Sequence, residues 1–115
     1  MKKVYYLAQC STCQRILNEV NWKGQLQDIR TEKINEEQLD QMAKMSGSYE
    51  SLFSRRALKY KSMGLKNKAL SETDYRQLIL EEDTLLMRPV FIVNNKIFVG
   101  NSKKTIEALS SVLNE

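Results

Sequence analysis

The sequence predicts an α/β fold in which a four-stranded mixed sheet with flanking helices carries a helical insertion. The first part of the chain has the pattern strand–helix–strand, and the last part has the pattern strand–strand–helix. A Cys-x-x-Cys pair, Cys10 and Cys13, lies where the first strand meets the first helix. A chain of 115 residues has the length of one domain. We therefore expect residues 1–115 to form a single domain, with the insertion at about residues 35–82.

The first half begins with a short apolar run over residues 3–8, which predicts a buried strand. Ser11 and Gln14 have the spacing of a capping box, and apolar residues at helical spacing follow until Gly24. Residues 26–32 alternate between polar and apolar side chains, as is typical of a second strand. Such a unit joins parallel strands through a right-handed crossover.

The middle of the chain predicts helices only. One helix begins at Asn35 and ends at Gly47, and a short helical piece follows over residues 48–56. A further helix begins at Ser71, which has Asp74 three positions later in the spacing of a cap.

The last part predicts a hairpin and a closing helix. Residues 90–93 and 97–99 are apolar and flank Asn94-Asn95-Lys96, where adjacent asparagines favour a tight turn. Ser102 then caps the final helix. This order, with the cysteine pair at the first strand–helix junction and Pro89 opening the third strand, is typical of thioredoxin-like proteins.

Cys10 and Cys13 are the only cysteines, and their position favours redox or nucleophilic chemistry over an inert buried pair. A thiol at a helix N-terminus is favoured as thiolate, which is the nucleophilic form. We expect Cys10 to be the more exposed thiol and to attack, and Cys13 to resolve the resulting adduct. From the residues alone, helix capping is the favoured role of Ser11.

The chain contains no histidine, which narrows the chemistry. Ser-His-Asp and Cys-His relays are excluded, as are His-based metal sites, and two cysteines cannot complete a structural zinc site. We expect no metal and no bound cofactor. Activation of Cys10 must therefore come from the helix end, backbone amides and cationic side chains.

The net charge of +4 is only mildly basic, and the lysines and arginines are spread along the chain. This favours solvated faces over a nucleic-acid surface, so direct nucleic-acid binding is not expected. The apolar run Val4–Ala8 is shorter than the roughly 7–15 residues of an export signal. No stretch approaches a membrane span. We expect a cytoplasmic protein, where a cysteine pair is more often catalytic or redox-sensing than structural.

Arginines near the predicted sheet are candidates for holding negative charge. Arg88 lies beside Pro89 at the start of a strand, where bidentate hydrogen bonds could hold a thiolate or an oxyanion. An ion pair with Glu81, Glu82 or Asp83 is an equal alternative. For Arg55 and Arg56, the residues alone favour a solvated helix edge.

Three ordered motifs resemble the arsenate reductase (ArsC)/Spx family over essentially the whole chain. They are Cys10-Ser-Thr-Cys13, then Ser54-Arg55-Arg56 with Tyr60-x-x-x-Gly64-Leu65, then Leu86-x-Arg88-Pro89-Val90-Phe91-Ile92-Val93 with Val99-Gly100. The resemblance implies a thioredoxin-like domain with an inserted helical region and a cis bond before Pro89. It also implies a nucleophilic Cys10, with Arg88 and Arg56 (or Arg55) holding an oxyanion or thiolate. Ser11, Thr12, Arg55 and Pro89 are the predicted substrate contacts.

The resemblance leaves two classes of function. One is a reductase of arsenate, a related oxyanion or a mixed disulfide, with glutathione, glutaredoxin or thioredoxin supplying the reducing thiol. The other is an Spx-like regulator that binds the RNA polymerase α C-terminal domain and is switched by a Cys10–Cys13 disulfide. Glutaredoxin-linked reductases of this family carry a third arginine after the last strand, where this chain has Lys103 and Lys104 instead. They also usually have a basic residue at the position that Gln14 occupies in this chain. The missing arginine and the Cys-x-x-Cys pair are features that favour the regulator, but the position of Cys10 with Arg56 and Arg88 makes the reductase the predicted function and the regulator its alternative.

Overall fold

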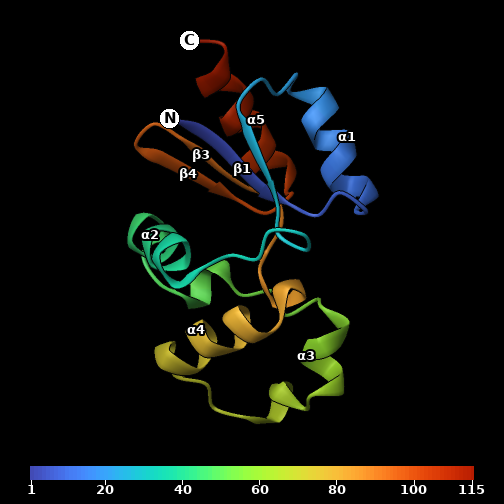
Figure 1. Ribbon diagram of the computed structural model, residues 1–115, viewed down its shortest axis with the longest axis vertical. Coiled ribbons are helices and arrows are strands. Elements are labelled where there is room, and N and C mark those ends of the chain that lie inside the picture. The colour runs from blue at the N-terminus through green and yellow to red at the C-terminus, as the bar shows by residue number, and fades with distance from the viewer. The chain divides into compact units, whose positions relative to one another are not determined.

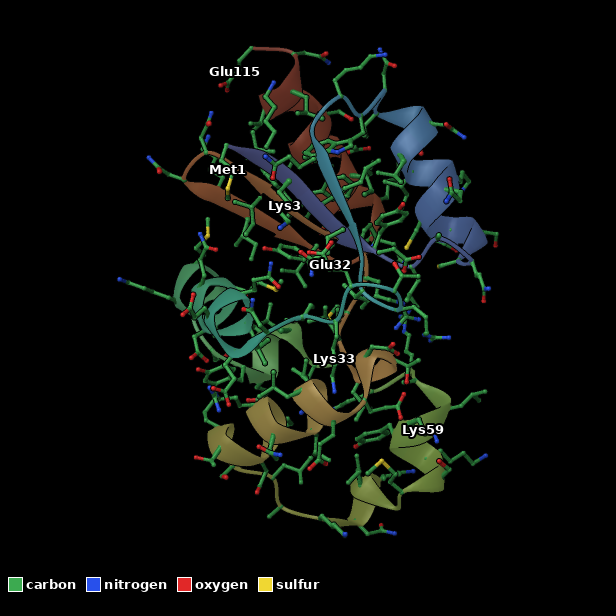
Figure 2. The ribbon with its side chains drawn as sticks, viewed as in Figure 1. Met1, Lys3, Glu32, Lys33, Lys59 and Glu115 are labelled. Atoms are coloured by element: carbon green, nitrogen blue, oxygen red, sulfur yellow. The ribbon has the colours of Figure 1, made fainter.

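The computed structural model describes residues 1–115 and divides into two compact units. The first unit comprises residues 1–32 and 88–115, and the second comprises residues 33–87. Figure 2 labels Glu32 and Lys33, where the chain passes from the first unit into the second. The assignment of residues 1–115 to one domain, with an insertion at about 35–82, stays a prediction.

The first unit is built on a four-stranded mixed sheet (Figure 1). Its strands are β1 (Lys2–Tyr6), β2 (Gln25–Asp28), β3 (Val90–Val93) and β4 (Lys96–Val99), in the spatial order β2-β1-β3-β4. β1 and β2 are parallel, and β3 runs antiparallel to both β1 and β4. The predicted mixed sheet is confirmed.

Helices α1 (Ser11–Glu19) and α5 (Lys103–Leu113) pack against one face of this sheet (Figure 1). Apolar side chains from both helices and from β1 and β3 form one buried cluster: Val4, Ile16, Phe91, Val93, Ile106 and Leu109. The Trp22 ring meets the Phe91 ring edge-on, with 5.0 Å between the ring centroids. Burial of this helical and strand face is the main source of stability in the unit.

Strand β2 ends earlier than the sequence predicts. The Asp28 carbonyl accepts hydrogen bonds from the amides of Thr31 (3.1 Å) and Glu32 (2.8 Å), and the Asp28 carboxylate accepts one from the Arg30 amide at 3.1 Å. The predicted strand over residues 26–32 is therefore a strand to Asp28 followed by a turn, because the aspartate side chain closes the chain locally. The first strand is likewise shifted, from residues 3–8 to Lys2–Tyr6.

The second unit contains the helices α2 (Glu36–Ser46), α3 (Leu58–Ser62) and α4 (Glu72–Glu81). Three short 3₁₀ turns join them: η1 (Glu50–Leu52), η2 (Leu65–Asn67) and η3 (Asp83–Leu85). The predicted helix starts at Asn35 and Ser71 are confirmed, and each is a complete capping box. The helical piece predicted over residues 48–56 is wrong beyond the turn η1.

An ionic network ties α2 to α4 in the second unit. Arg76 donates to both carboxylate oxygens of Asp40, at 2.8 and 3.2 Å, and the Tyr49 hydroxyl donates to Asp40 at 2.6 Å. Since both oxygens of the carboxylate are engaged, the pair has the geometry of a fork-to-fork contact.

The register of the sheet positions the candidate site. Tyr5 near the end of β1 pairs with Val90 at the start of β3. The chain that enters β3 at Arg88 and Pro89 therefore runs beside the chain that leaves β1 toward Cys10. None of the helices is long and apolar enough to cross a membrane.

Candidate active site around Cys10

Cys10 is the N-cap of α1, with an extended backbone (φ −84°, ψ 112°), and the helix begins at Ser11. Its amide donates to the Leu7 carbonyl at 3.0 Å, and its own carbonyl accepts from the Gln14 amide at 3.1 Å. The sulfur therefore stands directly ahead of the free amides of the first helical turn.

The capping box predicted at Ser11 is wrong. Ser11 is already helical, so the extended cap position falls to Cys10. The Gln14 side chain donates instead to the Ala8 carbonyl at 3.0 Å and so fixes the turn before Cys10.

Both sulfurs are free thiols and differ in exposure. Cys10 is half-buried, whereas Cys13 has 0% of its surface exposed. This confirms that Cys10 is the more accessible of the two. Cys13 lies inside the first turn of α1, among the buried residues of that helix.

The surroundings of Cys10 favour its ionised form. Partial burial opposes ionisation, but the backbone amide and the thiol of Cys13, the backbone amide of Thr12 and the positive charge of Arg88 outweigh it. Together they lower the pKa of the Cys10 thiol below its ordinary value.

Cys13 behaves in the opposite way. Burial, and after it the neighbouring Cys10, raise the pKa of its thiol to about 11, although a hydrogen bond from the Leu7 backbone and the charge of Arg88 act to lower it. At neutral pH, Cys13 is therefore a protonated donor beside an ionisable Cys10. The two sulfurs are differentiated as the roles of attacking and resolving thiol require.

Arg88 and Pro89 complete the candidate site within the first unit. Arg88 is half-buried, and its charge acts on both sulfurs. The bond between Arg88 and Pro89 is cis, as the resemblance implies. Pro89 is buried, and its carbonyl accepts a hydrogen bond from the amide of Gly100 at 2.9 Å.

Arg55 and Arg56 belong to the second unit. Arg55 donates to Glu50 at 2.8 Å and to the Tyr75 hydroxyl at 3.0 Å, and the hydrogen bond to Glu50 raises its pKa. Arg56 is exposed in a turn rather than on a helix edge, and it forms no ion pair within its unit. Of the predicted arginines, the structure brings only Arg88 together with the cysteines inside one unit.

The remaining predicted contacts lie on α1. Ser11 is exposed, and Thr12 is half-buried with its amide acting on the Cys10 sulfur. No group of three or more cysteine, aspartate or glutamate side chains is placed to hold a metal ion.

Sequence reasoning missed two backbone contributors to this site. The backbone of Leu7 contacts both cysteines, since its carbonyl accepts from the Cys10 amide and its amide acts on the Cys13 sulfur. The Gly100 amide holds Pro89 in place. The identities of side chains do not predict such main-chain hydrogen bonds. Only Gly100 could have been noticed in the sequence, because its positive φ of 89° favours glycine.

The chain is similar to known proteins both in sequence and in fold. The ArsC family matches residues 5–109, and no curated protein matches the chain. Among solved structures, the YFFB protein has a TM-score of 0.82 at 19% identity, over 98% of this chain and 99% of its own. An arsenate reductase from Vibrio cholerae has a TM-score of 0.76 at 17% identity, over 94% of each chain. A "possible arsenate reductase" from Streptococcus mutans has a TM-score of 0.73 at 25% identity, over 95% of this chain and 97% of its own.

These likenesses confirm the thioredoxin-like α/β fold expected from the order of strands and helices. The family match spans the cysteine turn, the second unit, the Arg88-Pro89 segment and the hairpin. On that match the chain belongs to the ArsC family, a family of thiol-dependent oxidoreductase type.

Proposed function

We propose that the protein is a thiol-dependent oxidoreductase of the arsenate reductase type, with Cys10 as its nucleophile. Its substrate is arsenate, a related oxyanion or a mixed disulfide of the glutathione type. The observation that supports this most is the pairing of a half-buried Cys10, whose pKa is lowered, with a fully buried Cys13, whose pKa is raised.

With arsenate, the reaction proceeds in two steps. The Cys10 thiolate attacks arsenic(V), forming a sulfur–arsenic bond, and one arsenic-bound oxygen leaves as water after protonation. A second thiolate then attacks the Cys10 sulfur, and the electron pair of the sulfur–arsenic bond stays on arsenic. Arsenic leaves as arsenite in the trivalent state, and Cys10 is left in a disulfide.

The proposed contacts supply positive charge and donors for the oxyanion. Arg88 stabilises the thiolate and the developing charge. The resemblance to the family assigns the second guanidinium to Arg56 (or Arg55). Ser11, Thr12 and Pro89 line the substrate at the start of α1. Lys103 and Lys104, exposed at the start of α5, occupy the place of the third arginine as simple point charges.

The reaction needs a thiol reductant and no bound cofactor. If Cys13 is the second thiol, the product is a Cys10–Cys13 disulfide that thioredoxin reduces. If glutathione is the second thiol, the product is a mixed disulfide that glutaredoxin reduces. Either route operates in a reducing compartment such as the cytoplasm.

The test is arsenate turnover by the reduced protein, assayed once with thioredoxin and its reductase and once with glutathione and glutaredoxin. We expect arsenite release with one of the two systems, and loss of release in Cys10→Ser. Arg88→Lys should weaken arsenate binding much more than folding, because lysine cannot make bidentate bonds. A folded, reduced protein that is inactive with both systems contradicts the proposal.

A regulator of the Spx type is the second candidate, and the proximity of two free thiols in one helical turn favours it. Here the Cys10–Cys13 disulfide controls binding to the RNA polymerase α C-terminal domain. A pull-down with that domain, oxidised against reduced, separates the candidates. Absence of binding in both states eliminates the regulator.

A further inference from the structure

One stretch of the second unit concentrates positive charge. Six of the 18 basic residues and none of the 14 acidic residues lie between Ser51 and Ser71. Outside that stretch, acidic residues outnumber basic ones. This corrects the expectation that the lysines and arginines are spread along the chain. We call residues 58–68, which carry four of these cations, the lysine segment.

The lysine segment presents its charges to solvent. Lys59, labelled in Figure 2, lies 3.9 Å from the carboxylate of the half-buried Glu82, which makes a weak pair at the surface. The other three lysines of the segment are exposed and form no ion pair within the unit: Lys61, Lys66 and Lys68.

Apolar side chains are exposed among these lysines. Leu58 is 85% exposed and Met63 is 41% exposed, which makes them two of only four large exposed apolar residues in the chain. Leu65, by contrast, is 4% exposed, and the Tyr60 ring packs against Phe53 with 5.9 Å between centroids. Leu65 and Tyr60 thus pack the segment against its own unit, whereas Leu58 and Met63 are exposed to solvent.

We infer that the lysine segment is a docking surface for an acidic protein segment that carries a large apolar side chain. Carboxylates of such a partner complement Lys61, Lys66 and Lys68, and its apolar side chain covers Leu58 and Met63. Exposed apolar residues ringed by charge are typical of protein interfaces, in which methionine is enriched. The complementary charges steer the encounter.

The observations favour a protein over the two other polyanionic partners. Single-stranded nucleic acid needs aromatic platforms, but the aromatic ring in the segment, Tyr60, packs against Phe53. A membrane surface is bound by long amphipathic helices, whereas α3 spans only Leu58–Ser62.

The test uses the whole protein and a fluorescein-labelled synthetic peptide made of glutamates around a central pair of leucines. Fluorescence anisotropy at low salt should show binding that weakens as salt is added. Charge reversal in Lys61→Glu/Lys66→Glu/Lys68→Glu should weaken binding by about tenfold or more. Leu58→Ser should weaken it severalfold without changing the salt dependence, because only the apolar contact is lost.

The matched control is Lys23→Glu/Lys33→Glu/Lys96→Glu, which changes the net charge equally at exposed lysines elsewhere. Its affinity for the peptide should stay within about twofold of the wild type. The inference fails if the peptide does not bind, or if the control weakens binding as much as the segment variant. It also fails if single-stranded DNA or phosphatidylserine-containing vesicles bind more tightly than the peptide. Cys10→Ser should bind the peptide normally, so this test and the turnover assay fail independently.

Discussion

Cys13 acts on Cys10 through two separate groups, its backbone amide and its thiol. Only the thiol is removed by mutation, so the two contributions can be divided. Cys13→Ala deletes the donor, whereas Cys13→Ser keeps a hydroxyl donor at the same position. We expect Cys10 to react about fivefold more slowly with iodoacetamide at pH 7 in Cys13→Ala than in the wild type, because a net hydrogen bond contributes about 1 kcal/mol.

The measurement is the rate of Cys10 alkylation against pH, followed by mass spectrometry of the peptide that contains it. Cys13→Ser should fall between Cys13→Ala and the wild type. Identical alkylation rates in all three proteins would show that the Cys13 thiol does not stabilise the Cys10 thiolate. The amides of the helix start would then be sufficient.

At the scale of residues, the sequence predicted which of the two cysteines is accessible but not the full environment of Cys10. Two cysteines after a short apolar strand were enough to predict which thiol is exposed. The cap position was wrong because the helix begins at Ser11 itself, so the N-cap residue is Cys10, and no side chain caps the helix there. The Leu7 contacts were unpredictable, since they are made by main-chain atoms that every residue carries.

Gly24, which precedes β2, lies in close contact with β1 and with the Trp22 ring. A Cβ atom placed there would lie 2.6 Å from the Lys2 carbonyl oxygen and 2.6 Å from Cζ2 of Trp22. The Trp22 indole is itself fixed, because its Nε1 donates to the Gln25 carbonyl at 3.1 Å. Gly24→Ala must therefore displace β1 or the indole, and we expect it to lower the free energy of unfolding by about 1–3 kcal/mol.

Urea unfolding followed by fluorescence suits this variant, since Trp22 is the only tryptophan. The native emission of Gly24→Ala should also shift, because the indole is forced to move. Lys23→Ala is the control: its side chain is exposed, and we expect a change below about 0.5 kcal/mol. A Gly24→Ala protein with the wild-type free energy of unfolding would contradict this prediction, because it would mean that β1 or the indole can shift without loss of stability.

At the scale of elements, signals made by side chains were the reliable ones. Asn35 was predicted as a helix start, and Ser71 and Ser102 as caps; each side chain accepts a hydrogen bond from the third residue of its helix. The Asn94-Asn95 turn was predicted because asparagine tolerates a positive φ, which Asn94 adopts at 56°. The end of β2 was missed because alternating side chains continue through a turn that Asp28 closes.

For the whole molecule, the two cysteines give the stability opposite dependences on pH. Folding lowers the pKa of Cys10. Below pH 9, the Cys10 thiol therefore binds a smaller fraction of a proton in the folded protein than in the unfolded chain. Stability from Cys10 therefore rises as pH increases through its folded pKa toward 9.0, the ordinary value. Burial of Cys13 raises its pKa instead, so above pH 9 the folded state holds the extra proton.

Between pH 9 and 11, the free energy of unfolding should consequently fall because of Cys13, whose pKa changes from 9.0 to about 11 on folding. At about 1.4 kcal/mol for each pKa unit, the loss is about 2–3 kcal/mol over that range. The pKa of Tyr5 is also raised, first by burial and second by the nearby charge of Glu32. Tyr5 therefore lowers the stability at high pH in the same way. The two contributions are separated by comparing urea unfolding of the wild type with that of Cys13→Ala at both pH values. We expect a distinctly smaller decline in Cys13→Ala, and an equal decline would place the high-pH sensitivity outside the cysteine pair.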